Sequence, residues 1–354
     1  MNLRNNGIFV RQLKQKLRKK IGPSLQWAAY STGMMQFLAR IKHIKGAIVL
    51  MYHSVADESQ TRWIDPHNHV PAGIFKEQME YLSLHRQVIE LAELIKILRN
   101  GFTPENGTAV ITFDDGYLDN LTVAAPILEN LGLVATLFLP TGYIDRGETQ
   151  WVDQAYTAFK FRTRSKLSWK GNQTVSFDLR YPAHGAEAYK NVCLSLMHNN
   201  GAKRRNLIDE LYVQLSPTDP PQRLTMDWDD VKMLLTKYNC FKIGGHSQEH
   251  TDMTRLTEDE MRDELEGCAR RIEDVLGIRP VHFSFPYGRT NTQLRKIAAE
   301  HGYDCAFGGM GFNPIIHSGT DPYDMPRVEA PALMGRFELA VSTSNTGIWR
   351  RLGR

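Results

Sequence analysis

The stretch that decides the fold runs from residue 109 to residue 117 and reads AVITFDDGY. Its apolar first part is typical of a buried strand. Two adjacent carboxylates, Asp114 and Asp115, follow where that strand should end. Because two neighbouring carboxylates are costly to bury without a positive partner, the stretch predicts a strand end that carries a cation.

A second motif supplies matching ligands. Residues 246–250 read HSQEH, so His246 and His250 stand four positions apart, directly after another strand-like segment at residues 241–243. One aspartate and two histidines are a common ligand set for a catalytic divalent metal, because three protein ligands leave a position open for water. The remaining aspartate is then available as a base acting on that water.

The bulk composition indicates an ordinary globular protein. The chain has 354 residues, of which 42% are apolar and 23% charged, enough for one large α/β domain with additions. None of the four cysteines forms a CxxC pair, which argues against a zinc knuckle or a disulfide framework. Buried free thiols in a reducing compartment are therefore expected.

Charge is concentrated at the N-terminus. Residues 1–46 hold ten of the 43 lysines and arginines and no acidic residue. The arm at residues 1–45 lacks the apolar core of a signal peptide, and no apolar run is long enough for a spanning helix. Its basic amphipathic pattern predicts either peripheral association with an anionic membrane or a helix packed on the body with a solvated basic face. Nucleic-acid binding is not expected, since no recognition module accompanies the charge. We expect a cytoplasmic location, with the arm on the inner face of the membrane.

Strand-like and helix-like segments alternate along most of the remaining chain, which predicts parallel strands with helices outside. This body is expected to span residues 46–345, followed by a short basic tail at residues 346–354. Residues of about 150–225 interrupt the alternation with polar helices and a hairpin at residues 163–179. They are predicted to form an insertion near one rim of a barrel. Further on, Thr257 and Glu260 form a capping box for a helix that Gly277 should end.

Three motifs in one order are specific enough to indicate a family. They read TFDDG at 112–116, HSQEH at 246–250 and FPYG at 285–288. The sequence resembles the polysaccharide deacetylases, also called NodB-homology or carbohydrate esterase family 4 enzymes, from about Ile48 to Ala330 apart from the insertion. The resemblance implies a distorted (β/α) barrel of about seven parallel strands, with the site at the carboxyl ends of the strands.

The resemblance also divides the ligands from the base. It implies that Asp115, His246 and His250 hold the metal, and that Ser247 holds the histidine loop by hydrogen bonding. Two imidazoles and a carboxylate favour Zn²⁺, and Co²⁺, Ni²⁺ or Fe²⁺ also suit them. Asp114 resembles the catalytic base, and the backbone N–H of Tyr287 resembles the donor to the oxyanion.

The general acid is expected from an unusual place. Many family members carry a Leu-x-x-His motif near the C-terminus, whereas here residues 50–53 read LMYH on a strand near the N-terminus. This resembles the permuted arrangement of the exopolysaccharide-type branch and implies that His53 is the acid. Ser284 stands where many members have an arginine that orients the base. Arg327 is expected to take that orienting role for Asp114.

The implied activity is hydrolysis of N-acetyl groups from amino sugars of an N-acetylated glycan or its precursor. Three alternatives stay open. One is deacetylation or deformylation of a lipid-linked amino sugar at the membrane surface. Another is a catalytically inactive barrel that only binds glycan. The third is a membrane-bound scaffold in which the arm is the active part. The sequence predicts no oligomeric state.

Overall fold

The computed structural model describes residues 46–342, except residues 58, 60, 171–173, 220–222 and 310–313. The predicted amphipathic arm at residues 1–45 and the basic tail at 346–354 lie outside the described residues.

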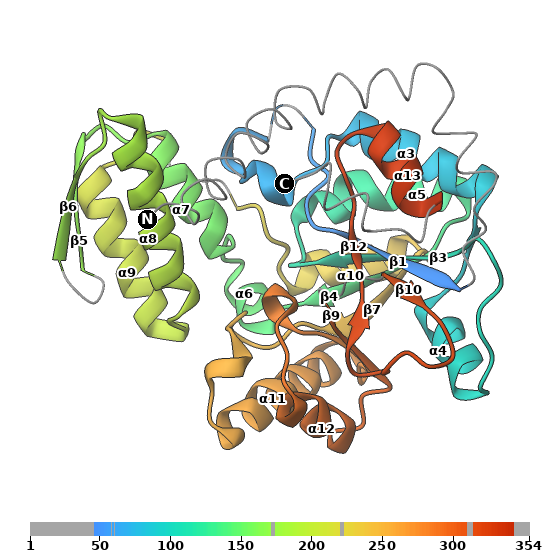
Figure 1. Cartoon of the computed structure of the whole chain (residues 1–354). Coiled ribbons are helices and arrows are strands. Elements are labelled where there is room, and N and C mark those ends of the chain that lie inside the picture. Colours follow the sequence, from blue (N-terminus) through green and yellow to red (C-terminus); the bar gives the residue numbers. More distant parts are fainter. Residues whose placement is uncertain are drawn as a thin grey trace, which may run out of the picture.

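A ten-stranded sheet forms the centre of the molecule, and its main path runs β10-β1-β3-β4-β7-β8-β9-β11 (Figure 1). Every pairing along this path is parallel except that of β10 with β1. The short strands β2 and β12 pair with β3 and β1. The strands are β1 Ala47–Tyr52, β2 Gln87–Val88, β3 Thr108–Asp114, β4 Ala135–Leu139, β7 Phe241–Gly245, β8 His282–Ser284, β9 Cys305–Gly309, β10 Ile315–Ile316, β11 Met325–Pro326 and β12 Val328–Glu329. The predicted α/β barrel of about seven parallel strands is confirmed.

One short segment bridges the two edges of this parallel sheet. Strand β11 pairs with β9 at one edge, and β12, only one residue further along the chain, pairs with β1 at the other. Residues 325–329 therefore bring the last strand back beside the first, so the sheet is nearly closed. Arg327 is the single residue between the two short strands, which places it at the closure.

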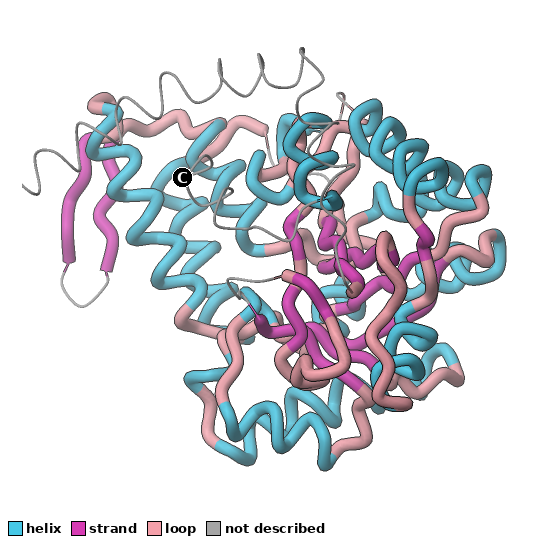
Figure 2. Tube along the Cα trace, turned by 45° about the vertical axis from the view of Figure 1, so that its right-hand side comes forward, coloured by secondary structure: helices cyan, strands magenta, loops and turns pink. Residues whose placement is uncertain are grey.

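Helices cover the outside of the sheet because each presents an apolar stripe to it (Figure 2). In α4, for example, Leu91, Leu94 and Ile95 are buried at the spacing of one helical face. The helix α11 begins with the predicted Thr257–Glu260 capping box and ends at Gly277 in the left-handed conformation, as expected. The helices of the barrel are α3 Ala72–His85, α4 Leu91–Arg99, η3 Asn120–Ala124, α5 Ala125–Leu131, α6 Thr141–Arg146, α10 Trp228–Lys237, α11 Glu258–Leu276, α12 Thr292–Glu300 and α13 Met334–Ser342, with short helical turns η1 Thr61–Trp63, η2 Pro66–Asn68, η4 Met253–Arg255 and η5 Pro286–Gly288.

The stretch predicted as an insertion forms a helical unit beside the barrel, seen in green at the left of Figure 1. It contains α7 Trp151–Lys160, β5 Lys166–Lys170, β6 Thr174–Asp178, α8 Pro182–Met197 and α9 Gly201–Leu215. The strands β5 and β6 pair antiparallel, so the predicted hairpin is confirmed. These elements share a hydrophobic core of their own, which Tyr143 of α6 joins. Within the described ranges, no helix has the length and hydropathy needed to cross a membrane.

Candidate active site

The acidic pair lies at the carboxyl end of β3. Asp114 is the last residue of the strand, and Asp115 turns the chain away from it with a φ of 72°. Gly116 continues the turn at φ 64°, where a Cβ atom would lie 2.9 Å from the side chains of both Ile144 and Leu139. The glycine of the TFDDG motif is therefore required by both backbone conformation and space.

Backbone strain gathers around this turn. Five non-glycine residues in the described part of the chain have a positive φ, and four of them are Asp115, Ser247, His250 and Tyr287. A left-handed conformation costs about 1 kcal/mol or more for a residue with a Cβ atom, so the surrounding structure must hold each of them in place. Such clustering is typical of a functional site.

Asp115, His246 and His250 come together as a buried three-residue cluster, with donor atoms all within 4.8 Å of one another. The Oδ1 atom of Asp115 lies 3.6 Å from Nε2 of His246 and 3.3 Å from Nε2 of His250. That oxygen is buried without a hydrogen-bond partner among the described residues. Burial, together with the charges of Asp114 and Asp153, raises the pKa of Asp115 well above its usual value. A bound cation would reverse that shift, so these residues fit a divalent metal.

Burial keeps both histidines neutral, as metal ligands must be. It lowers the pKa of His246 and lowers that of His250 further, because the charge of Arg204 adds to the effect. Nδ1 of His246 lies 2.6 Å from the carbonyl oxygen of Ser284. Since a carbonyl only accepts, Nδ1 carries the proton and the Nε2 lone pair faces Asp115. Nδ1 of His250, in contrast, has no partner among the described residues.

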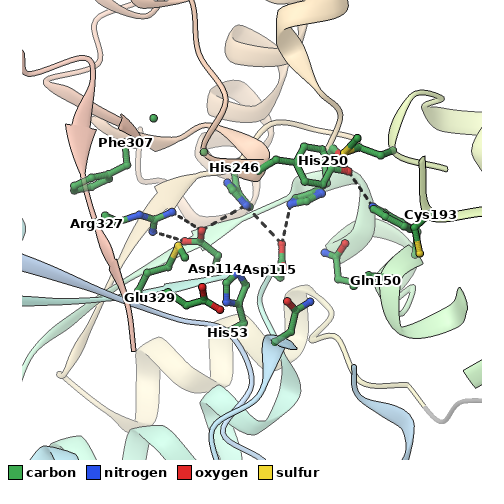
Figure 3. A pocket seen from close by; sticks show the side chains of 18 of the residues that line it. His53, Asp114, Asp115, Gln150, Cys193, His246, His250, Phe307, Arg327 and Glu329 are labelled. Carbon is green, nitrogen blue, oxygen red and sulfur yellow. Dashed lines mark hydrogen bonds and ion pairs between the residues drawn. The ribbon is translucent and has the colours of Figure 1, made fainter. Parts of the chain in front are cut away.

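Asp114 is held by Arg327, as Figure 3 shows. The guanidinium donates from Nη1 to Oδ1 at 2.7 Å and from Nη2 to Oδ2 at 2.6 Å, a bidentate pair. The same Nη2 lies 2.7 Å from Oγ of Ser284, the residue at the position where many members of the resembled family have an arginine. Burial by itself would raise the pKa of Asp114, but the charge and the hydrogen bonds of Arg327 outweigh it and hold that pKa below its usual value. Asp114 is therefore ionised.

His53 follows β1 and lies below the two aspartates in the view of Figure 3, with Glu329 beside it. The backbone of His53 is fixed because its carbonyl oxygen accepts a hydrogen bond from Nδ2 of Asn120 at 2.9 Å. Burial lowers the pKa of the imidazole, while the charges of Asp114 and Glu329 raise it. The LMYH strand thus brings its histidine to the same end of the barrel as Asp114.

Tyr287 lies in η5, at φ 60°. Its hydroxyl donates to the carbonyl oxygen of His250 at 3.0 Å and accepts from Nε1 of Trp151 at 3.0 Å. The side chain of Ser247 does not act as the resemblance implied, because its hydroxyl has no hydrogen-bond partner among the described residues. The backbone holds that loop instead, since the carbonyl oxygen of Ser247 accepts from the N–H of Thr141 at 3.1 Å.

All seven residues predicted for the site line one pocket of about 520 Å³. The barrel provides its polar side. The insertion provides a wall that is mainly apolar, and this wall could not be assigned to the site from sequence. Its lining residues are Trp151, Val152, Tyr189, Lys190, Cys193, Leu194 and Met197.

The comparison with known families agrees with this geometry. Residues 102–306 match the model of the family described as polysaccharide deacetylase. Among curated proteins, the putative polysaccharide deacetylase YxkH of Bacillus subtilis is 34% identical over 92 residues, covering 26% of this chain and 30% of that protein. Chitin deacetylase 1 of Cryptococcus neoformans is 35% identical over 86 residues, covering 24% of this chain and 16% of that protein. The matched stretches span less than a third of either relative.

Solved structures share the fold. The deacetylase PplD of Streptococcus pyogenes, solved in complex with acetate, has a TM-score of 0.54 at 16% identity, covering 85% of this chain and 100% of that one. IcaB from Ammonifex degensii has a TM-score of 0.53 at 15% identity, covering 84% of this chain and 97% of that one. At such identities the likeness concerns the fold alone.

Proposed function

This chain belongs to the polysaccharide deacetylase family, whose model covers more than half of it, and we propose that it removes N-acetyl groups from amino sugars of a glycan. One observation carries the proposal. An ionised carboxylate, Asp114, is held by Arg327 directly beside a buried three-ligand cluster. A fixed base next to a metal-binding set is the arrangement that amide hydrolysis by an activated water needs.

Asp115, His246 and His250 would hold the metal, and Zn²⁺ suits two imidazoles and one carboxylate best, with Co²⁺, Ni²⁺ or Fe²⁺ as alternatives. When bound, such an ion polarises the acetyl carbonyl and increases the acidity of water. The neutral state that burial imposes on both histidines keeps their lone pairs available for it. Asp115 adds the negative charge that makes this set selective for a cation.

Asp114 is the proposed base. Its carboxylate takes the proton of the attacking water, and Arg327 keeps it ionised and correctly oriented before the reaction begins. The two N–H donors of Arg327 engage both oxygens of Asp114, so the carboxylate cannot rotate freely. The backbone N–H of Tyr287 is the proposed donor to the oxygen of the tetrahedral intermediate.

His53 is the proposed acid. Amide nitrogen is a poor leaving group until it is protonated, so His53 donates a proton to it as the carbon–nitrogen bond breaks, releasing acetate and a free amine. The negative charges of Asp114 and Glu329 favour the protonated imidazole that this step requires and oppose the effect of burial.

The test is acetate release together with metal analysis. We expect the purified protein to contain about one metal ion per chain. It should release acetate and free amine in equal amounts from N-acetylated oligosaccharides, and a chelator that removes the metal should stop this release. A catalytically inactive glycan-binding barrel would instead be folded, loaded with metal and inert on every N-acetylated substrate offered. That outcome would overturn the proposed activity.

A second candidate keeps the chemistry and changes the substrate to a lipid-linked amino sugar at a membrane surface. The observation that favours it is the apolar wall of the pocket. Two polar groups of this wall are already engaged, because Nε1 of Trp151 donates to Tyr287 and the hydroxyl of Tyr189 donates to Asp65. Leu194, with 39% of its surface exposed, would cover part of a lipid chain, and Lys190 beside it would meet a phosphate.

Matched substrates separate the two candidates. Leu194→Asp should raise KM for a lipid-linked N-acetylated sugar about tenfold, because one buried apolar contact is lost. Its KM for the water-soluble counterpart should stay unchanged. Val213→Asp, which alters a 71% exposed residue on α9 outside the pocket lining, is the control and should change neither. Equal KM changes for both substrates in Leu194→Asp would exclude the lipid-linked candidate.

A further inference from the structure

We propose that Arg204, on α9 of the insertion, is a positioning residue for His250, so that the insertion completes the metal site of the barrel. This inference rests on the proposed metal site. It concerns how one ligand of that site is held, and by which part of the chain.

Arg204 reaches out of the insertion into the histidine loop. Its Nη1 donates to the carbonyl oxygen of Glu249 at 2.8 Å, and its Nη2 donates to that of His250 at 3.1 Å. The same Nη1 lies 3.1 Å from the hydroxyl of Tyr143. Nε donates to the carbonyl oxygens of Leu196 and Asn199, which anchors the side chain at the end of α8. One guanidinium thus ties the insertion to two consecutive peptide groups of the metal-binding loop.

Burying the charged side chain of Arg204 costs free energy, which argues that the residue has a structural role. Only 2% of Arg204 is exposed, and the five acceptors around it are all neutral oxygens. Burying a cation with no carboxylate bound to it costs several kcal/mol unless its hydrogen bonds are well made. Arg204 offsets this cost with its planar array of donors, which hydrogen-bonds to all five oxygens.

His250 needs such support more than His246 does. The ring of His246 is oriented by its hydrogen bond to the carbonyl of Ser284, which His250 lacks. The backbone of His250 is also strained, with a φ of 45°. The ring packs edge-on against those of His246 and Tyr287, at centroid distances of 4.9 and 4.8 Å. Its position is therefore set through its backbone and its ring packing.

A second connection from the insertion reaches the same atom. Nε1 of Trp151, on α7, donates to the hydroxyl of Tyr287, and that hydroxyl donates to the carbonyl oxygen of His250. The guanidinium of Arg204 also lies over the ring of Trp151, 5.7 Å from its centre. Two helices of the insertion thus converge on one carbonyl group. Because both connections favour the same placement of His250, metal affinity should depend on the docked insertion.

The experiment measures zinc affinity of the metal-free full chain by competition with a chelator, and repeats it with cobalt to follow the absorption spectrum of the bound ion. Arg204→Met should weaken zinc binding about 10- to 100-fold, the range found when groups that orient ligands are removed. Arg204→Lys, which keeps the charge and can still reach a carbonyl, should recover part of the loss. Arg164→Met is the matched control, because Arg164 also binds a carbonyl, that of Val213, but within the insertion. It should bind zinc as the wild type does.

If Arg204→Met fails to fold, Tyr287→Phe provides a second test. This change removes only the hydroxyl that donates to His250 and leaves the backbone N–H in place. It should lower zinc affinity several-fold and alter the cobalt spectrum. A folded Arg204→Met with zinc affinity within threefold of wild type would overturn the inference, as would an unfolded Arg204→Met combined with unchanged affinity in Tyr287→Phe. A wild-type protein that binds zinc and releases acetate would show that the proposed function survives either result.

Discussion

The barrel and the insertion contribute to one pocket in opposite ways. The barrel supplies reactive groups at the ends of parallel strands, and it pairs the buried carboxylate of Asp114 with the guanidinium of Arg327. The insertion supplies an apolar wall and a buried cation, Arg204, that binds neutral carbonyls of the barrel. The difference shows that a unit with its own hydrophobic core can still belong to the active site. In the proposed function, the chemistry belongs to the barrel, and the insertion contributes support and part of the substrate-binding wall.

The largest effect should come from the metal ligands of the barrel. Asp115→Asn removes the charged ligand with little change in shape, so we expect loss of bound metal and a fall in turnover of about 10³-fold or more, because metal ions contribute several kcal/mol to such reactions. Asp178→Asn, in the hairpin of the insertion, is the control and should retain both. Metal content and acetate release measure the outcome. Full metal content in Asp115→Asn would contradict the ligand assignment.

Substitution of His53 tests whether this residue protonates the leaving amine. His53→Gln should lower kcat for the N-acetyl amide about 10²-fold, within the usual range for general acid catalysis. An activated acetyl ester needs no such proton, so its hydrolysis should change only slightly. The two substrates are assayed side by side on the same preparation. Equal losses on ester and amide would show that His53 is not the acid.

Substitution of Arg327 tests whether the residue at the closure of the barrel also orients the base Asp114. Arg327→Met should lower kcat/KM about 10²-fold, since Asp114 loses both oriented hydrogen bonds. Removing the positive charge also raises the pKa of Asp114, so the acidic limb of the pH profile should move to higher pH. Arg327→Lys keeps the charge without the bidentate geometry and should show a smaller shift. An unchanged pH profile in Arg327→Met would exclude the orienting role.

The smallest effect concerns stability of the barrel alone. Burial lowers the pKa of His282 on β8 to about 4. Its pKa in the unfolded chain is about 6.5, so the unfolded state binds more protons between these values. The contribution of His282 to the free energy of unfolding is therefore fully present above pH 6.5 and is lost as the pH falls towards 4. His282→Gln should remove up to about 3 kcal/mol of this acid sensitivity, as measured by denaturant unfolding at pH 7 and pH 4.5. An identical pH dependence of the free energy of unfolding in the wild type and in His282→Gln would contradict this contribution of His282.

The elements that could be predicted are those with a local signal. The strand before Asp114, the HSQEH motif and the capping box at Thr257 each lie within a few consecutive residues, and each lies where the pattern predicted. Parallel strands with helices outside followed from the alternation of such segments, and the barrel followed from the family resemblance. The carboxyl ends of its strands then bring distant motifs together, because parallel strands end at one edge.

The missed features depend on contacts between distant segments. Strands β11 and β12 are two residues each, too short for any periodicity, so the way they close the sheet could not be foreseen, and the role of Arg327 was expected from the resemblance alone. Arg204 stands in a polar helix among other basic residues, and nothing in that pattern distinguishes a buried arginine from an exposed one. Ser247 was expected to hold the histidine loop by hydrogen bonding, and it does so through its backbone carbonyl, while its hydroxyl has no partner among the described residues.

The most direct test of this account compares Asp114→Asn with the wild type for metal content and acetate release. Asp114 lies beside the ligand cluster, 3.7 Å from Nε2 of His246, yet it is assigned to the reaction and not to the metal. We expect Asp114→Asn to retain its metal ion and to lose turnover by about 10³-fold, within the range for removal of a general base. Turnover within a few-fold of wild type, or loss of the metal, would contradict the division between the base Asp114 and the ligand Asp115.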